Sequence, residues 1–418
     1  MINIGRPVRL ALLVSVAGLC GGIGRAQTTD TGIDINLSAE ASKNPYLTDV
    51  SSEWVGAGSV EARPWLRHSD GKDSVTLRGL ARVRGFTSRY DPETAFGADL
   101  QANSRLSART SAFGSASILT TNRRTPFDVL TPRPGLTDPV VPPETTGPIV
   151  DPIVPLPGEC DALLGSQGRI TTMTVGAGVS HQLDVSSSLG YNIDYRRLDS
   201  ESSRDLQTVG YDSVSVGANY SRVISPRTRA GVAASAGTTR YDGNRPSATT
   251  FSLSGTLSQQ LSRYWALSGS LGVSSTRAEN NGFFPGYSSV APVGSISVCN
   301  QPVRKNFCFS YSRSQQPTFL GDVRTSDAVS ASYSEQLSNR QRADLSASYS
   351  RSKTADDAQT LYPDVEGLSL RGVFSQSIND RLEGYVSASV AKSYGGYLSR
   401  DPSINFGVGV RLRLGVRR

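Results

Sequence analysis

The amino-acid sequence predicts an all-β fold: a closed antiparallel transmembrane β-barrel of about 18 strands, with roughly 16 to 18 as the expected range. Three observations carry this prediction. A short polar turn recurs along the chain, and alternating apolar and small polar residues flank each turn. After the N-terminal segment, no apolar run reaches the roughly 18 residues that a membrane-spanning helix needs.

The N-terminal residues 1–26 have the pattern of a secretory signal peptide. Arg6 and Arg9 form its charged region, an apolar run follows from Leu10 to Leu19, and small residues lead to Ala26. We therefore expect the mature chain to begin at Gln27 and residues 27–418 to form the barrel.

The recurring turn sets the length of the repeat. Its six copies are separated by 77, 41, 37, 76 and 41 residues, so two intervals are about twice the others. A seventh turn fits between Cys299 and Cys308 and divides one long interval, while a proline-rich insertion accounts for the other. Each repeat of about forty residues then holds two strands. The apolar residues that mark the six turns are Leu106, Leu183, Ile224, Leu261, Leu337 and Ile378.

The strands are expected where apolar residues alternate with polar ones. Val75 and Val83 alternate with Arg78 and Arg82, which gives one face suited to lipid and one suited to water. Most such segments run about 10 to 15 residues, enough for a tilted strand to cross a membrane. The clearest segments are 74–88, 94–105, 169–182, 186–197, 211–223, 249–261, 265–275, 327–338, 342–353, 367–378, 382–392 and 403–416.

The connections differ in length on the two sides of the predicted barrel. The recurring turns are short, whereas connections such as 198–207, 277–289 and 355–366 are longer. In outer-membrane barrels the short turns are periplasmic and the long loops extracellular. Residues 122–168 form the largest loop and are rich in proline, which favours an extended conformation that cannot pair as a strand. We expect this segment to be an extracellular loop insertion.

Three cysteines follow the signal segment, namely Cys160, Cys299 and Cys308. An exported protein folds where disulfides form. Because Cys299 and Cys308 face each other across the seventh turn, we predict a disulfide that links the two strands of this hairpin.

Arginines are the candidate pore-lining residues. Barrel closure brings the last strand beside the first, and the polar positions of this wall include Asp34, Glu40, Glu61 and Asp99 as well as seven arginines. An excess of positive charge in a tube concentrates anions, and arginine binds carboxylates and phosphates. The alternative is a ladder of cross-strand ion pairs that neutralises itself. The seven arginines are Arg63, Arg78, Arg82, Arg84, Arg105, Arg411 and Arg413.

The sequence gives little basis for catalysis, a cofactor or a metal site. His68 and His181 are the histidines, and neither belongs to a recognisable nucleophile arrangement. The formal charge of +7 falls to +4 without the signal segment and is dispersed, which argues against a nucleic-acid partner. Two acidic clusters lack the spacing of a calcium-binding loop. These clusters are Asp199, Glu201 and Asp205, and Asp356, Asp357 and Asp364.

The alternating strands, the repeated turns and the opening segments 35–47 (INLSAEASKNPYL) and 54–66 (WVGAGSVEARPWL) resemble the porin-type outer-membrane barrels that accompany exopolysaccharide export loci in Gram-negative bacteria. The resemblance implies an outer-membrane location, contact with lipid, passage of a secreted and often acidic polysaccharide, and periplasmic and inner-membrane export partners. One departure is the C-terminus, where Phe406 is the last aromatic residue although many such barrels end in one.

Three functions follow as expectations. The first is a channel that exports an anionic exopolysaccharide. The second is a general diffusion porin for small solutes, and the third is a structural or adhesive surface barrel whose proline-rich loop binds a partner. The transported solute, the oligomeric state and the position of the 122–168 loop relative to the pore stay open at this stage.

Overall fold

The computed structural model describes residues 28–47, 53–88, 90–122, 169–200, 209–243, 245–280, 286–302, 304–318, 322–354, 364–395 and 401–416. The predicted signal segment and residues 123–168 of the proline-rich insertion lie outside these residues, as does Cys160. Among the described residues, no helix is long and apolar enough to cross a membrane.

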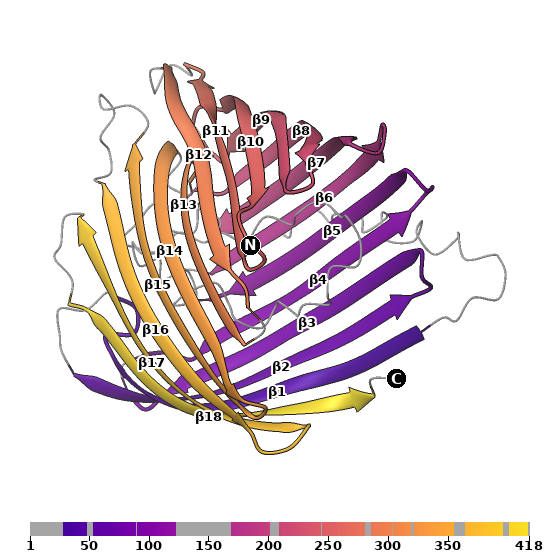
Figure 1. Ribbon diagram of the computed structural model, residues 1–418. Coiled ribbons are helices and arrows are strands. Elements are labelled where there is room, and N and C mark those ends of the chain that lie inside the picture. Colours follow the sequence, from indigo (N-terminus) through magenta and orange to yellow (C-terminus); the bar gives the residue numbers. More distant parts are fainter. Residues whose placement is uncertain are drawn as a thin grey trace, which may run out of the picture.

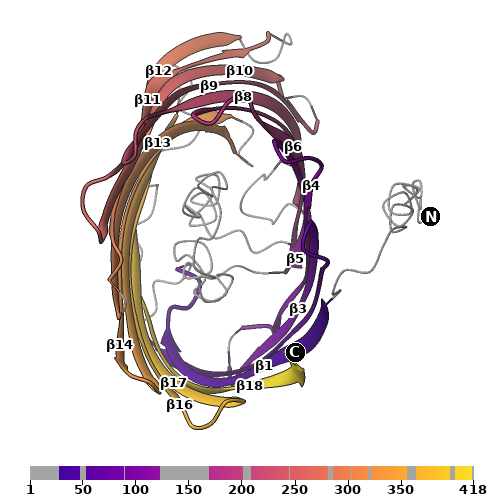
Figure 2. The ribbon, with the colours of Figure 1, turned by 45° about the vertical axis from the view of Figure 1, so that its right-hand side comes forward.

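Eighteen antiparallel strands form one closed sheet, as the sequence predicts (Figures 1 and 2). The sheet closes where β1 pairs with β18, from Thr31 opposite Val416 to Lys43 opposite Ile404. Every strand thus has two hydrogen-bonding neighbours, so no strand has an edge that is unpaired along its whole length, an edge that a membrane does not tolerate. The strands are β1 (Thr28–Lys43), β2 (Trp54–Ser69), β3 (Asp73–Phe86), β4 (Glu93–Arg105), β5 (Thr110–Thr121), β6 (Ile170–Gln182), β7 (Ser187–Ser200), β8 (Tyr211–Ser225), β9 (Thr228–Tyr241), β10 (Ala248–Gln260), β11 (Trp265–Ala278), β12 (Tyr287–Asn300), β13 (Lys305–Pro317), β14 (Val323–Ser338), β15 (Gln341–Thr354), β16 (Val365–Ser377), β17 (Leu382–Gly395) and β18 (Ser403–Val416).

The two rims of the barrel differ in their connections. One rim carries the seven turns expected from the sequence, including the turn between Asn300 and Lys305, and an eighth between Ser69 and Asp73. The first and last described residues, Thr28 and Val416, lie at this short-turn rim, because Thr28 pairs with Ser69 and Val416 with Thr31. The longer connections all lie at the opposite rim, which we call the long-loop rim.

The outer face of the barrel is apolar and exposed. Leu271, Val290 and Val408 have more than half of their surface accessible, and they belong to alternating positions that face away from the lumen. Such a surface is stable only in contact with lipid. The barrel therefore spans a membrane with its strands, in agreement with the prediction.

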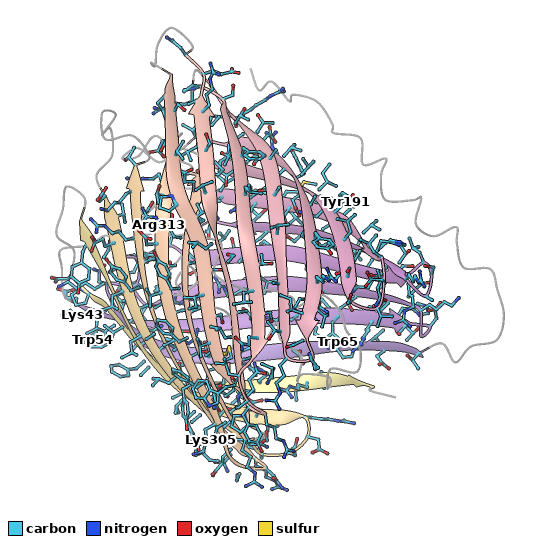
Figure 3. The ribbon with its side chains drawn as sticks, turned by 45° about the horizontal axis from the view of Figure 1, so that its top comes forward. Lys43, Trp54, Trp65, Tyr191, Lys305 and Arg313 are labelled. Carbon is cyan, nitrogen blue, oxygen red and sulfur yellow. A yellow bond between two sulfur atoms is a disulfide. The ribbon has the colours of Figure 1, made fainter. Side chains whose placement is uncertain are left out.

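Polar and aromatic side chains mark the ends of this apolar band. On β13, the lipid-facing Lys305 is the first residue, at the short-turn rim, and the lipid-facing Arg313 lies further along the strand toward the long-loop rim (Figure 3). Near the long-loop rim, the Tyr311 hydroxyl donates to Asp327 (2.9 Å) and the Tyr349 hydroxyl donates to Glu366 (3.0 Å). Tyrosines that combine an aromatic ring with a bonded hydroxyl fit the interface between hydrocarbon and water.

Candidate channel lumen

All seven predicted arginines face the lumen. They lie on β18, β2, β3 and β4, at positions that alternate with exposed apolar residues such as Val60, Leu77 and Phe96. Together with β1, these strands form one wall of the barrel, which we call the charged wall. The structure thus brings the predicted residues together, as strand alternation and barrel closure require.

Most of these arginines are paired with carboxylates. Glu93 at the start of β4 is fully buried and forms ion pairs with Arg82 and with Arg84, the latter at 3.7 Å. Arg84 also donates to Glu40 of β1. Asn405 of β18 donates to the same Glu40 carboxylate at 3.4 Å. Four strands thus share one buried network near the long-loop rim.

A second group of ion pairs lies nearer the short-turn rim. Glu383 of β17 accepts from Arg411 at 3.4 Å and from Arg413 at 3.1 Å. Arg63 binds Glu61 at 2.6 Å. Of the remaining arginines, Arg78 lies opposite Asp99 in the register, and Arg105 is exposed near the rim.

The charged wall is therefore close to neutral. Glu93 and Glu383 were not among the carboxylates expected from the sequence, although strand alternation places both on the lumen side. With Asp30 and Arg67, which lie opposite each other on β1 and β2, the wall holds eight arginines and six carboxylates, and Glu383 of the adjacent β17 is the seventh carboxylate beside them. The geometry is that of a cross-strand ion-pair ladder.

The opposite wall is lined by hydroxyls. From β8 to β17, the lumen-facing positions are mainly Ser, Thr, Gly and Ala, and directly opposed serines hydrogen-bond across neighbouring strands. We call this surface the hydroxyl wall. The bonded pairs are Ser235 and Ser252 (2.6 Å), Ser270 and Ser295 (3.0 Å), Ser310 and Ser330 (2.6 Å), and Ser348 and Ser369 (2.7 Å).

One arginine interrupts the hydroxyl wall at mid-height. Arg371 of β16 faces the lumen between Ser346 of β15 and Ser389 of β17. Among the described residues it forms no ion pair. Its positive charge is therefore available to a solute.

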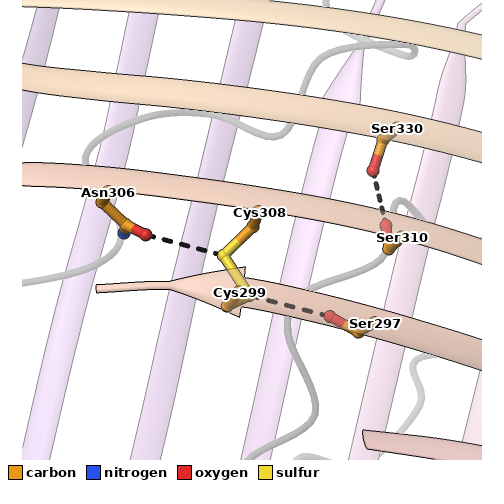
Figure 4. Close-up of a disulfide and its surroundings, with 6 residues drawn as sticks. All are labelled: Ser297, Cys299, Asn306, Cys308, Ser310 and Ser330. Carbon is orange, nitrogen blue, oxygen red and sulfur yellow. Dashed lines mark hydrogen bonds between the residues drawn. A yellow bond between two sulfur atoms is a disulfide. The ribbon is translucent and has the colours of Figure 1, made fainter. Parts of the chain in front are cut away.

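Cys299 of β12 and Cys308 of β13 form a disulfide on the lumen side (Figure 4). The two residues are directly opposed in the register, and their Cα atoms lie 4.1 Å apart. The bond links the hairpin just above its short turn.

Two groups of residues narrow the mouth at the long-loop rim. Beyond β1, Tyr46 and Leu47 are buried, and the Tyr46 ring contacts the rings of Phe86 and Tyr90 at 5.7 and 5.2 Å. Across the lumen, the Tyr241 hydroxyl donates to the Asp322 backbone carbonyl at 2.6 Å. Burial raises the pKa of the Asp322 carboxyl, whereas Thr318 and Arg324 lower it.

The two histidines lie apart from this lumen network. His68 contacts Thr29 at 2.8 Å and His181 contacts Thr110 at 3.0 Å, both near the short-turn rim. No group of three or more His, Cys, Asp or Glu residues in the described part of the chain is placed to hold a metal ion. Of the two acidic clusters, only Asp199 and Asp364 are described.

Comparison with known proteins gives structural neighbours alone. No family model and no curated protein matches this chain. OccK2 (OpdF) of Pseudomonas aeruginosa is 10% identical over 93% of this chain and 98% of its own, with a TM-score of 0.47. A BenF-like porin from Pseudomonas fluorescens Pf-5 is 9% identical over 93% and 99%, also with 0.47. The ferric-catecholate import receptor Fiu of E. coli K12 is 11% identical over 92% and 81%, with 0.42.

The architecture of the barrel indicates the membrane in which the protein lies. Closed barrels with an apolar outer band, short turns at one rim and long loops at the other are outer-membrane proteins. The band, the rims and the closure described above meet each of these criteria. The protein is an outer-membrane barrel.

Proposed function

We propose that this protein is a diffusion channel for small hydrophilic solutes, the second of the three functions expected from the sequence. The observation that carries the proposal is the hydroxyl wall, which presents many uncharged hydrogen-bonding groups along one side of a barrel of this size. Barrels of about 16 to 18 strands enclose an aqueous channel. Weak, replaceable contacts to hydroxyls let a solute move without being held.

The charged wall supports weak ion selectivity in this channel. Arginine and carboxylate side chains that bind each other leave little field to attract a counter-ion, so the seven predicted arginines are proposed as pore-lining but largely neutralised. Arg371 is the main exception at mid-height, because no described residue forms an ion pair with it. We expect a small preference for anions that depends on this side chain.

Export of an anionic exopolysaccharide, which the resemblance implies, has less support. An acidic polymer needs unpaired positive charge along its path, and the pairs with Glu40, Glu93 and Glu383 consume most of it. The narrowed mouth also leaves less width for a chain. The adhesive function depends on the 122–168 loop, which lies outside the described residues.

Swelling of liposomes that contain the purified protein tests the proposal. Liposomes placed in solutions of neutral sugars of increasing size should swell at rates that fall steadily with sugar size. Liposomes without protein give the background. Swelling no faster than this background for the smallest sugar would refute a diffusion channel.

Deletion of the gene separates the two transport functions. Loss of small-solute uptake with unchanged extracellular polymer fits the diffusion channel. Loss of extracellular polymer with accumulation in the periplasm would instead establish export.

A further inference from the structure

One seam of the barrel is incompletely paired. β12 and β13 are in register only from Gly294 opposite Arg313 to Asn300 opposite Phe307, which is seven residue pairs, whereas β17 and β18 share ten. Above Gly294, β12 still pairs with β11 along its other edge as far as Tyr287. The wall is therefore split between β12 and β13 from mid-height to the long-loop rim.

Two prolines explain why the ladder stops there. The backbone N–H of Gln301 donates to Tyr264 next to β11, so odd-numbered residues of β12 direct their backbone groups toward β11 and even-numbered ones toward β13. The next ladder position above Gly294 on this side is Pro292, which has no N–H.

The same holds for the opposing strand. Lys305 donates its N–H to Pro302, so odd-numbered residues of β13 face β12 with their backbone groups. Continued pairing would place Gln315 opposite Pro292 and Pro317 opposite Val290. Each of the next two hydrogen-bonded positions would thus contain a proline on the side that faces the seam, and the split follows from the sequence.

A single proline elsewhere has a smaller effect. Pro64 of β2 interrupts the register with β3 between Ala62 and Trp65, and pairing resumes on both sides of the gap. Among the described strands, only the seam of β12 and β13 has two prolines at successive positions of the same ladder.

Near the long-loop rim, β13 lies on the lumen side of β12. Gln315 belongs to the lipid-facing positions of β13, together with Phe307 and Phe309, yet its amide binds lumen-facing residues of the neighbouring strands. It accepts from Thr276 of β11 at 3.2 Å and donates to Ser289 of β12 at 3.4 Å. A side chain at a lipid-facing position of β13 can reach these lumen-facing residues only if this part of β13 lies on the lumen side of β12.

The start of β14 follows β13 into the lumen. Val323 is buried against Ala248 and Ala278, and its backbone N–H donates to the Tyr287 hydroxyl at 3.3 Å. Asp322 accepts from Tyr241 of β9, four strands away from β13 in the sheet. The ends of this hairpin, residues 314–318 and 322–326, therefore extend across part of the mouth.

The disulfide lies directly below the split. Cys299 and Cys308 belong to the short paired segment of the same seam, and no other disulfide joins two strands in the described residues. The bond keeps the lower part of the seam closed while the upper part is separated. It therefore fixes the point about which the hairpin can move.

We propose that residues 314–318 and 322–326 are a gate built into the barrel wall, which rests on the proposed channel function. In the structure the hairpin occupies the lumen side of β11 and β12 and narrows the mouth. In the second position it lies in the wall, with Ser314 opposite Val293 and Gln316 opposite Ala291, and the mouth is wider. The prolines weaken the ladder in this second position, so the hairpin is not held there.

Paired cysteine substitutions distinguish the two positions, each in a Cys160→Ser background. Thr276→Cys with Gln315→Cys reports the inner position through a short bifunctional thiol cross-linker, because these residues face opposite sides of the wall once the hairpin leaves the lumen. Ala291→Cys with Gln316→Cys reports the wall position through a disulfide, because this pair repeats the geometry of Cys299 and Cys308 further up the seam. Peptide mapping by mass spectrometry identifies each link.

The proposal predicts that both links form in folded protein and that single-channel conductance is lower in the first than in the second. Adding Pro292→Val to the second pair should raise the linked fraction about fivefold, the factor that one net hydrogen bond of about 1 kcal/mol gives. Pro64→Val is the matched control and should leave that fraction unchanged.

Two results would overturn the gate: absence of the Ala291 to Gln316 link with and without Pro292→Val, or equal conductance of the two linked forms. If both links form but no variant conducts, the channel function itself fails, and the gating role fails with it while the two hairpin positions stand.

Discussion

The charged wall and the hydroxyl wall satisfy polar groups in different ways within one sheet. Two carboxylates, the buried Glu93 and the half-buried Glu383 of the adjacent β17, each bind two arginines of the charged wall. On the hydroxyl wall, directly opposed serines hydrogen-bond to each other in separate pairs. The loss of one group should therefore affect a network on one side and a single pair on the other.

The largest expected effect is on the free energy of unfolding of the protein, after a substitution in the charged wall. Glu93→Ala leaves Arg82 and Arg84 without their shared buried partner, which typically costs about 3 to 5 kcal/mol. Urea unfolding of the protein in lipid vesicles measures the change. Ser330→Ala on the hydroxyl wall is the matched control, since the loss of one hydroxyl pair costs about 1 kcal/mol. Equal losses would contradict the difference between the walls.

The next effect is on ion selectivity at the short-turn rim. Glu383→Gln removes the carboxylate that Arg411 and Arg413 share, so the reversal potential in a salt gradient should shift toward anion preference. Glu335→Gln provides the control, because Glu335 pairs with Lys305 at the same rim but on the lipid-facing side. A shift of the same size in both variants would show that the lumen pairs do not govern selectivity.

A smaller shift of opposite sign is expected at mid-height. Arg371→Ser replaces the unpaired cation with the residue type that surrounds it, so anion permeability should fall while conductance for neutral sugars stays unchanged. The lipid-facing Lys392→Ser variant on β17 is the control. Unchanged reversal potential in Arg371→Ser would mean that this side chain does not contact the ion path.

The smallest expected effect lies outside the walls, in the turn between β6 and β7. Hydrogen bonds from Ser186 and Ser187 lower the pKa of Asp184 to about 2. Because this pKa is below that of the unfolded chain, about 3.9, the stabilisation is present above that value and is lost as the pH falls through about 2. Asp184→Asn should thus unfold at lower urea than the unchanged protein at neutral pH, with the gap closing near pH 2. A gap that is independent of pH would refute this.

Much of the fold and part of the lumen could be predicted from the sequence. The strand period of two places Arg78, Arg82 and Arg84 on one face, and closure adds Arg411 and Arg413, so their positions follow from topology. The same rule places Glu93 on the lumen side. Glu93 was not predicted because it is the first residue of β4, and the ends of a strand are the least certain part of its predicted range.

The split between β12 and β13 was not predicted, although the two prolines that cause it are present in the sequence. Pro292 and Pro317 are far apart in the sequence, and their effect appears only once the register sets them on neighbouring rungs of one ladder. Pro64 shows that a proline in a strand does not by itself open the wall. The relative position of two strands, and not a local signal, decides the outcome.

The reversal potential of the unmodified protein in a planar bilayer under a salt gradient tests the central claim most directly. Because the eight arginines of the charged wall are balanced by seven carboxylates on that wall and on the adjacent β17, the account predicts a conducting channel with a reversal potential close to zero and displaced slightly toward anions. A potential near the limit for a purely anion-selective pore would show that the arginines act as free charges, and cation selectivity would contradict the account as well.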